Sequence, residues 1–124
     1  MAAKSSRPEL ARLRIRADFL RAARGIRRST ASLTLETCPT PQPEARSGAL
    51  RVGFTASRKV GNAVARNRAK RRLRAAAAAL LPLYGAAGHD YVLVARAATL
   101  TRPFPALLED LKAALEAAAA KTKA

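Results

Sequence analysis

Residues 55–74, TASRKVGNAVARNRAKRRLR, combine dense positive charge with the clearest helical pattern in the chain. Asn62 is a favourable N-cap, and we expect a helix from there to about Leu81. On a helical wheel its small and apolar residues form one narrow stripe: Ala65, Ala69, Leu73, Ala76 and Leu80. This stripe lets the helix lie close to a sheet, while six Arg and Lys side chains and Asn67 point outward.

No acidic side chain balances this helix. Residues 46–89 contain ten Arg and Lys and no Asp or Glu. A helix that is only solvated usually mixes Glu with Lys or Arg at i,i+4 spacing, because such pairs are stabilising. The uncompensated charge therefore indicates an external polyanion, and nucleic acid is the first candidate because its phosphates are closely spaced.

The rest of the composition is that of one small globular domain. The chain has 124 residues, of which 49% are apolar, and its 24 Lys and Arg against 8 Asp and Glu give a net charge of +16. No apolar stretch is long enough to predict a membrane span. We expect a disordered basic tail over residues 1–8, a single RNA-binding domain over 9–120 and a disordered tail over 121–124.

Flanking patterns predict the order α-β-β-α-β-α, a single-domain α/β sandwich of the α+β class. The first helix begins at Glu9 or Ala17 and ends near Arg24, before Gly25. Strands are expected at 31–37, 50–57 and 90–96, and a last helix opens at Thr101–Pro103.

The strand at 50–57 has two different faces. Val52, Phe54 and Ala56 alternate with the residues of the other face, which are Arg51, Gly53, Thr55 and Ser57. We expect this second, polar face to be open to solvent or to a ligand.

The sequence lacks the residues that a protein nuclease needs. His89 is the single histidine, and the adjacent Glu109 and Asp110 do not share a helix face. Cys38 is the only cysteine, so no intramolecular disulfide and no cysteine-based zinc site can form, which fits a reducing, intracellular setting. We therefore expect no catalytic residue and no metal site in this chain.

The charged stretch resembles the protein component of bacterial ribonuclease P. The resemblance rests on Ser57–Val64, on Arg66-Asn67-Arg68-Ala69-Lys70-Arg71 and on Arg74. It extends to Arg12–Arg14 with Asp18 and Phe19, to Arg51–Phe54 and to His89–Arg96, and so covers about residues 10–118. It implies a fold like the second domain of ribosomal protein S5.

The resemblance also implies a function and a set of contacts. A catalytic partner RNA, working with Mg²⁺ in the cytoplasm, would remove the 5′ leader of precursor tRNA, with this protein as its subunit. The protein itself would bind no cofactor and would need no membrane and no protein partner. Contacts to the catalytic RNA are implied for Arg58, Lys59, Asn62, Arg66, Asn67, Arg68, Lys70, Arg71 and Arg74. A leader cleft is implied for Arg12, Phe19, Arg51, Thr55 and Ser57.

One departure and one alternative accompany this resemblance. Relatives often carry a second aromatic residue one turn after the Phe19 position, where this chain has Ala23. Stacking on the leader would then be weaker. A structural RNA-binding protein of ribosomal type, with no role in cleavage, stays open as the alternative.

Overall fold

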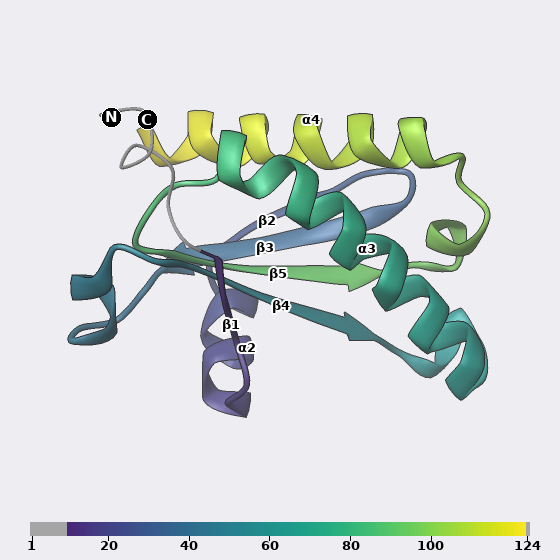
Figure 1. Cartoon of the computed structure of the whole chain (residues 1–124), viewed down its shortest axis with the longest axis horizontal. Coiled ribbons are helices and arrows are strands. Elements are labelled where there is room, and N and C mark those ends of the chain that lie inside the picture. Colours follow the sequence, from purple (N-terminus) through teal and green to yellow (C-terminus); the bar gives the residue numbers. More distant parts are fainter. Residues whose placement is uncertain (1–9, 124) are drawn as a thin grey trace.

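A five-stranded sheet in the order β1-β4-β5-β3-β2 forms the centre of the computed structural model, which describes residues 10–123 (Figure 1). β1 pairs with β4 and β4 with β5 in parallel, whereas β3 pairs antiparallel with both β5 and β2. In chain order the elements are β1 (Leu10–Arg12), α2 (Arg16–Ala23), β2 (Ile26–Ser29), β3 (Leu33–Pro39), β4 (Leu50–Ala56), α3 (Ala63–Tyr84), β5 (His89–Ala95) and α4 (Phe104–Lys123).

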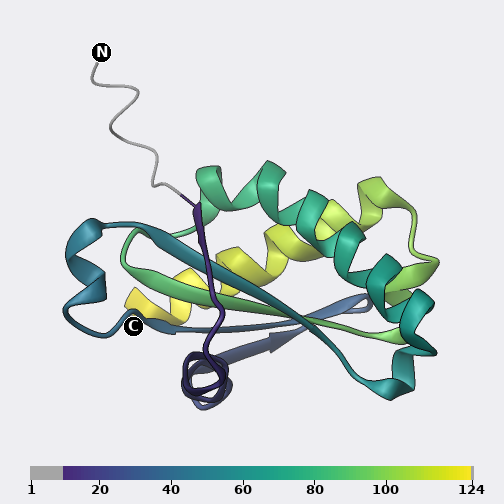
Figure 2. The same cartoon turned by 60° about the horizontal axis from the view of Figure 1, so that its bottom comes forward.

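Helices cover the sheet unequally. The long helices α3 and α4 lie side by side on one face, and the short α2 lies on the other (Figures 1 and 2). The main core fills the space under α3 and α4, with Leu33, Leu50, Leu73, Leu93 and Leu111 fully buried. A second, smaller cluster under α2 contains Leu13, Ala22, Cys38 and Val92. Since α2 has only eight residues, part of this second face remains uncovered.

The predicted basic helix is confirmed as α3. The side-chain oxygen of Asn62 accepts a hydrogen bond of 2.9 Å from the Ala65 N–H and so caps the helix. Its buried side consists of Ala69, Leu73, Ala76, Ala77 and Leu81, close to the stripe expected from the sequence. The helix runs on to Tyr84, past Pro82, and Gly85 N–H closes it by donating to Leu81 O at 2.8 Å.

The three helices and three long strands occur in the predicted order, but that order was incomplete. The sequence patterns predicted neither β1 nor β2. Leu10 and Leu13 have helical spacing, yet Leu10 lies in a three-residue edge strand that pairs with β4. Arg27 and Arg28 make β2 too short and too charged to be recognised as a strand. The conformation of both segments depends on tertiary structure, because each forms a strand only by pairing with a longer strand.

The ends of the predicted elements also differ. The strand predicted at 31–37 corresponds to β3, which begins at Leu33 and continues to Pro39 because β5 pairs with it up to His89. α4 continues to Lys123, beyond the limit of 120 expected for the domain. The predicted tail over residues 1–8 lies outside the described residues.

Candidate nucleic-acid interface

The outward side of α3 is an exposed surface of positive charge. Asn67, Arg68, Arg71 and Arg74 are exposed, and Arg66 and Lys70 are half-buried. Within residues 10–123, none of these cations forms an ion pair with a carboxylate. The structure thus brings the predicted RNA-contacting residues of the helix onto one element, and their charges remain available to phosphates.

The turn before the helix extends this surface. Arg58 and Lys59 are exposed in a single 3₁₀ turn, η2 (Arg58–Val60), whose N-cap is Ser57. Gly61 follows with a φ of 144°, which side chains rarely adopt, and the chain turns there into α3. The Asn62 oxygen is committed to the cap, so only its amide N–H groups are open to a ligand.

Arg72, another cation of α3, hydrogen-bonds to the backbone of a different part of the chain. Its guanidinium donates hydrogen bonds to the carbonyl oxygens of Thr99 at 2.7 Å and Arg102 at 2.6 Å. These bonds tie α3 to the connection between β5 and α4. The set of RNA contacts implied by the resemblance does not include Arg72.

The uncovered face of the sheet presents hydroxyls and cations. Thr55 lies beside Val94, Val94 beside Thr34, and Thr34 beside Ser29, so these residues form a row across four strands. The row borders an open cleft of about 640 Å³. The cleft is lined by Arg27, Ser29, Thr34, Ser57, Lys59, Val60, Val94, Ala95, Arg96 and Ala97.

Phe19, on α2, lies at one edge of this open face of the sheet. Phe19 and Thr55 line an adjoining hollow of about 320 Å³ together with Arg14, Arg16 and Phe54. The ring lies directly against the backbone of Gly53, where an added Cβ would sit 2.5 Å from Phe19 Cε1. Gly53 is therefore required for this close approach of helix and strand.

The candidate site residues predicted from the sequence did not include Arg14, Arg16, Arg27 and Arg96, which line the cleft and the hollow. Their charge was visible in the sequence, but β2 had to be known before Arg27 could be placed beside Ser57. The structure thus adds four arginines to a face for which the resemblance had implied Arg12 and Arg51 as the cations.

Glu36 is a buried acidic residue on this face of the sheet. It is buried at 7% exposure, and its carboxylate lies 3.9 Å from Arg27 Nε. Burial raises the pKa of Glu36, and the charge of Arg27 opposes that rise.

Arg51 does not line the open cleft. Its Nε and Nη2 each donate a 2.7 Å hydrogen bond to the carboxylate of Asp90, which is fully buried, and Nη2 lies 3.3 Å from Asp18 Oδ1. Thr40 Oγ1 donates a further 2.7 Å bond to Asp90. The hydrogen bond with Asp90 raises the pKa of Arg51. Because Asp18 belongs to α2, this network fastens α2 to the sheet and positions Phe19.

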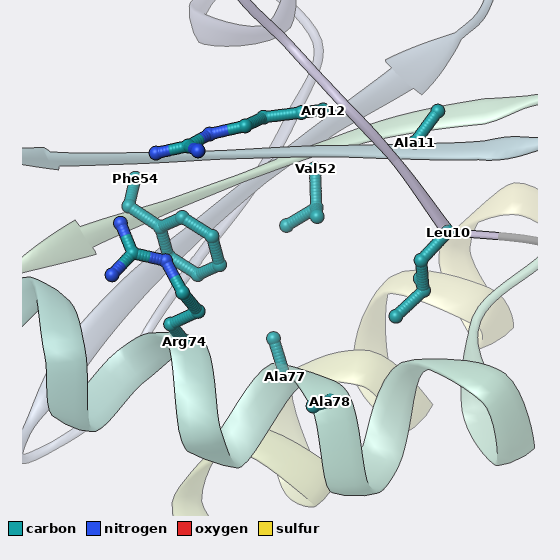
Figure 3. Close-up of a pocket in the computed structure, with 8 residues that line it drawn as sticks. All are labelled: Leu10, Ala11, Arg12, Val52, Phe54, Arg74, Ala77 and Ala78. Atoms are coloured by element: carbon teal, nitrogen blue, oxygen red, sulfur yellow. The ribbon is translucent and has the colours of Figure 1, made fainter.

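Arg12 lies on the opposite face from Phe19. In the register of β1, Arg12 stands beside Val52, whose side chain belongs to the core under α3. Figure 3 shows Arg12 above a pocket that it shares with Phe54 and Arg74. Of the five residues implied for the leader cleft, the structure brings Phe19, Thr55 and Ser57 to one open face and places Arg51 and Arg12 elsewhere.

Groups typical of metal or thiol chemistry are sparse in the described part of the chain. Residues 10–123 contain no cluster of three His, Cys, Asp or Glu side chains that could hold a metal ion. Cys38 is a buried free thiol, and burial raises its pKa. Between residues 10 and 123, no helix is both long and apolar enough to cross a membrane.

Known proteins share both the sequence and the fold. The family model Ribonuclease P matches residues 8–119. The ribonuclease P protein component of Paramagnetospirillum magneticum is 50% identical over 116 residues, covering 92% of this chain and 86% of the relative. That of Ruegeria pomeroyi is 54% identical over 104 residues, covering 83% and 82%.

A solved structure agrees with these relatives. The RNase P protein of Staphylococcus aureus superposes with a TM-score of 0.70 at 25% identity, covering 86% of this chain and 94% of that one. The family model spans the sheet, α2, α3, most of α4 and both charged surfaces. On this evidence, the chain belongs to the ribonuclease P protein family.

Proposed function

We propose that this chain, the protein component of a ribonuclease P, uses the two faces of its sheet for two different RNAs. The cation-rich side of α3 binds the catalytic RNA, and the open face beside Phe19 holds the 5′ leader of precursor tRNA. One observation carries the proposal. The open face is lined by cations and hydroxyls and lies opposite α3, so both RNAs fit at once.

The open face suits a single strand. Exposed guanidinium groups of Arg14, Arg16, Arg27 and Arg96 would contact backbone phosphates, and the Thr55 and Ser57 hydroxyls would accept or donate hydrogen bonds to sugars or bases. Phe19 offers one aromatic ring at the edge of the sheet for stacking on a base. These contacts are tolerant of sequence, as a subunit that processes many tRNAs requires.

Cleavage itself is assigned to the RNA. Mg²⁺ held by that RNA would supply the activated water that hydrolyses the phosphodiester bond. The described residues offer cations and hydroxyls but no carboxylate cluster, so this chain would bind and orient the substrate. Its cations would also offset the repulsion between two polyanions, which lowers the Mg²⁺ concentration needed. We place this activity in the cytoplasm, where the unpaired Cys38 thiol would stay reduced.

A cleavage assay tests the proposal. Precursor tRNA is incubated with the cognate RNA at low Mg²⁺, with and without the protein. We expect the protein to increase the cleavage rate and to tighten binding of precursor tRNA more than that of mature tRNA, which lacks the leader. An unchanged rate, or equal tightening for both tRNAs, would contradict the proposal.

Variants of the open face refine the test. Thr55→Val keeps the side-chain shape and removes the hydroxyl from the open face. We expect it to weaken precursor binding by a few-fold while leaving the affinity for the catalytic RNA unchanged. Thr101→Val, an exposed threonine between β5 and α4, serves as the matched control.

A further inference from the structure

A pocket on the α3 side of the sheet is not explained by either surface described so far. It lies between β1, β4 and α3 and has a volume of about 210 Å³ (Figure 3). It is lined by Leu10, Ala11, Arg12, Val52, Phe54, Arg74, Ala77 and Ala78. The resemblance implied a contact with the leader for Arg12 and with the catalytic RNA for Arg74, whereas the structure places both residues at one pocket.

The interior of this pocket is apolar and left open by small side chains. Ala77 and Ala78 form the α3 wall, with Val52 opposite and Leu10 at one end. Leu10 is 36% exposed even though it borders the pocket, so part of its apolar surface faces solvent. A concave apolar surface of this kind is typical of a ligand site, since leaving it solvated is unfavourable.

The other end of the pocket is cationic and aromatic. Arg74 Cζ lies 5.4 Å from the centre of the Phe54 ring. Figure 3 shows the guanidinium groups of Arg12 and Arg74 extending toward the same end of the pocket, on either side of Phe54. Both arginines are exposed, and neither pairs with a carboxylate within residues 10–123.

The apolar interior and the cationic, aromatic end of the pocket together indicate the kind of ligand that it would bind. An apolar interior beside an aromatic ring accepts a flat, weakly polar group, and two unpaired guanidinium groups accept an anion such as a phosphate. A nucleotide carries both parts. Its base must be unpaired to enter, because a base within a duplex is stacked and hydrogen-bonded.

The position of the pocket identifies which RNA supplies the nucleotide. Arg66, Lys70 and Arg74 follow one another at i,i+4 spacing along a single side of α3. From Arg66 to Arg74 the helix rises about 12 Å, so an RNA that contacts Arg66 reaches the pocket at Arg74. The leader face lies on the other side of the sheet.

We propose that this pocket binds one unpaired nucleotide of the catalytic RNA, with the base between Leu10, Val52 and Ala78 and the phosphate held by Arg12 and Arg74. The proposal rests on the proposed function, because it requires that α3 bind this RNA. It reassigns Arg12 from the leader to the catalytic RNA and gives β1 a role in binding.

Filling the pocket tests the proposal without altering charge. In Ala78→Met the longer side chain occupies the space for the base, and the adjacent Ala79→Met is the matched control because Ala79 is exposed and does not line the pocket. We expect Ala78→Met to weaken binding of the catalytic RNA about fivefold or more, the lower end for losing one stacked base. The slope of log K against log salt should not change. Equal affinities for the two variants, at equal thermal stability, would overturn the proposal.

A second test removes one guanidinium group and measures both the affinity for the catalytic RNA and its salt dependence. Arg12→Gln should weaken binding and reduce the salt slope by about 0.7, the value for one phosphate contact with a single strand. Arg24→Gln removes an exposed charge at the end of α2 and serves as the control. An affinity for precursor tRNA that falls while the affinity for the catalytic RNA stays constant would return Arg12 to the leader and overturn the reassignment.

A crosslink locates the RNA directly. Ala78→Cys introduces a cysteine beside the pocket, whereas the natural Cys38 is buried at 7% exposure and should label poorly. A photoreactive group on this cysteine should crosslink to an unpaired nucleotide of the catalytic RNA. Crosslinks confined to the tRNA leader would refute the assignment. The parent protein could bind the catalytic RNA while the pocket variants bind it as tightly as their control variants. In that case the pocket proposal fails and the proposed function stands. If the parent does not bind that RNA, the proposed function fails.

Discussion

Replacing Asp90 by Asn should destabilise the protein more than any change of an exposed acid. Asp90 is fully buried and receives three hydrogen bonds of 2.7 Å, two from Arg51 and one from Thr40. Asn keeps the shape of the side chain and removes the charge. The Arg51 side chain, only 16% exposed, then retains a single carboxylate partner, Asp18 at 3.3 Å.

The expected cost follows from this geometry. Breaking one side of a buried ion pair costs about 3–5 kcal/mol, because the remaining charge is left poorly solvated. Asp18 still compensates part of the Arg51 charge, so we expect the lower end, about 3 kcal/mol. For a domain of this size that corresponds to a drop in Tm of roughly 10–15 °C.

Urea denaturation of the parent and the variant measures the difference in unfolding free energy. Glu109→Gln is the control, because Glu109 is exposed on α4, and we expect it to fall within about 0.5 kcal/mol of the parent. If Asp90→Asn also falls within this range, the network does not fasten α2 to the sheet and the reasoning is refuted.

A double variant separates stability from function. In Arg51→Met combined with Asp90→Leu both charges are replaced by apolar groups, and such replacements are often neutral for stability. The link from the sheet to Asp18 on α2 is lost as well. We therefore expect stability nearer to that of the parent than in Asp90→Asn, with weaker binding of the tRNA leader because Phe19 is less firmly positioned.

Three further changes test other parts of the structure. Arg68→Ala should weaken binding of the catalytic RNA and lower its salt slope by about 0.9, which a titration at several salt concentrations measures; an unchanged affinity would contradict its assigned contact. Gly53→Ala should cost about 1–3 kcal/mol in urea denaturation and reduce leader binding, because the new Cβ would overlap the Phe19 ring; a stability equal to that of the parent would show that the ring moves freely. Burial raises the pKa of Glu36, so its contribution to stability declines as pH rises from the ordinary pKa of a glutamate through the raised value; Glu36→Gln should abolish this decline in Tm measured from pH 4 to 8, and identical profiles would refute the shift.

The sequence predicted the parts of the fold that depend on local patterns. The small-residue stripe, the Asn62 cap and the absence of acids together defined α3, because all three are properties of one segment. The alternation from Arg51 to Ser57 correctly separated the two faces of β4. In both cases the periodicity of a single element carries the information.

Pairing between distant segments could not be predicted in this way. Arg51 is on the expected face, but it meets Asp90, which is 39 residues away, and α2 covers both. Arg12 was implied by the resemblance to lie with Phe19, but a three-residue strand in register with Val52 turns it toward α3. A shift of that register by one residue would place Arg12 on the same face as Phe19, since side chains alternate between faces.

The alternation of β4 explains how so small a protein can serve two RNAs. Phe54 faces the pocket beside α3, and its neighbours Gly53 and Thr55 face the side of the sheet that carries Phe19. Consecutive residues of one strand thus contribute to both proposed RNA surfaces, separated only by the thickness of the sheet. Arg51 and Asp90 neutralise each other in a buried ion pair, so neither adds net charge to either surface. Because the uncompensated cations lie on both sides of the sheet, the excess charge of the chain is better explained by two RNA contacts than by one.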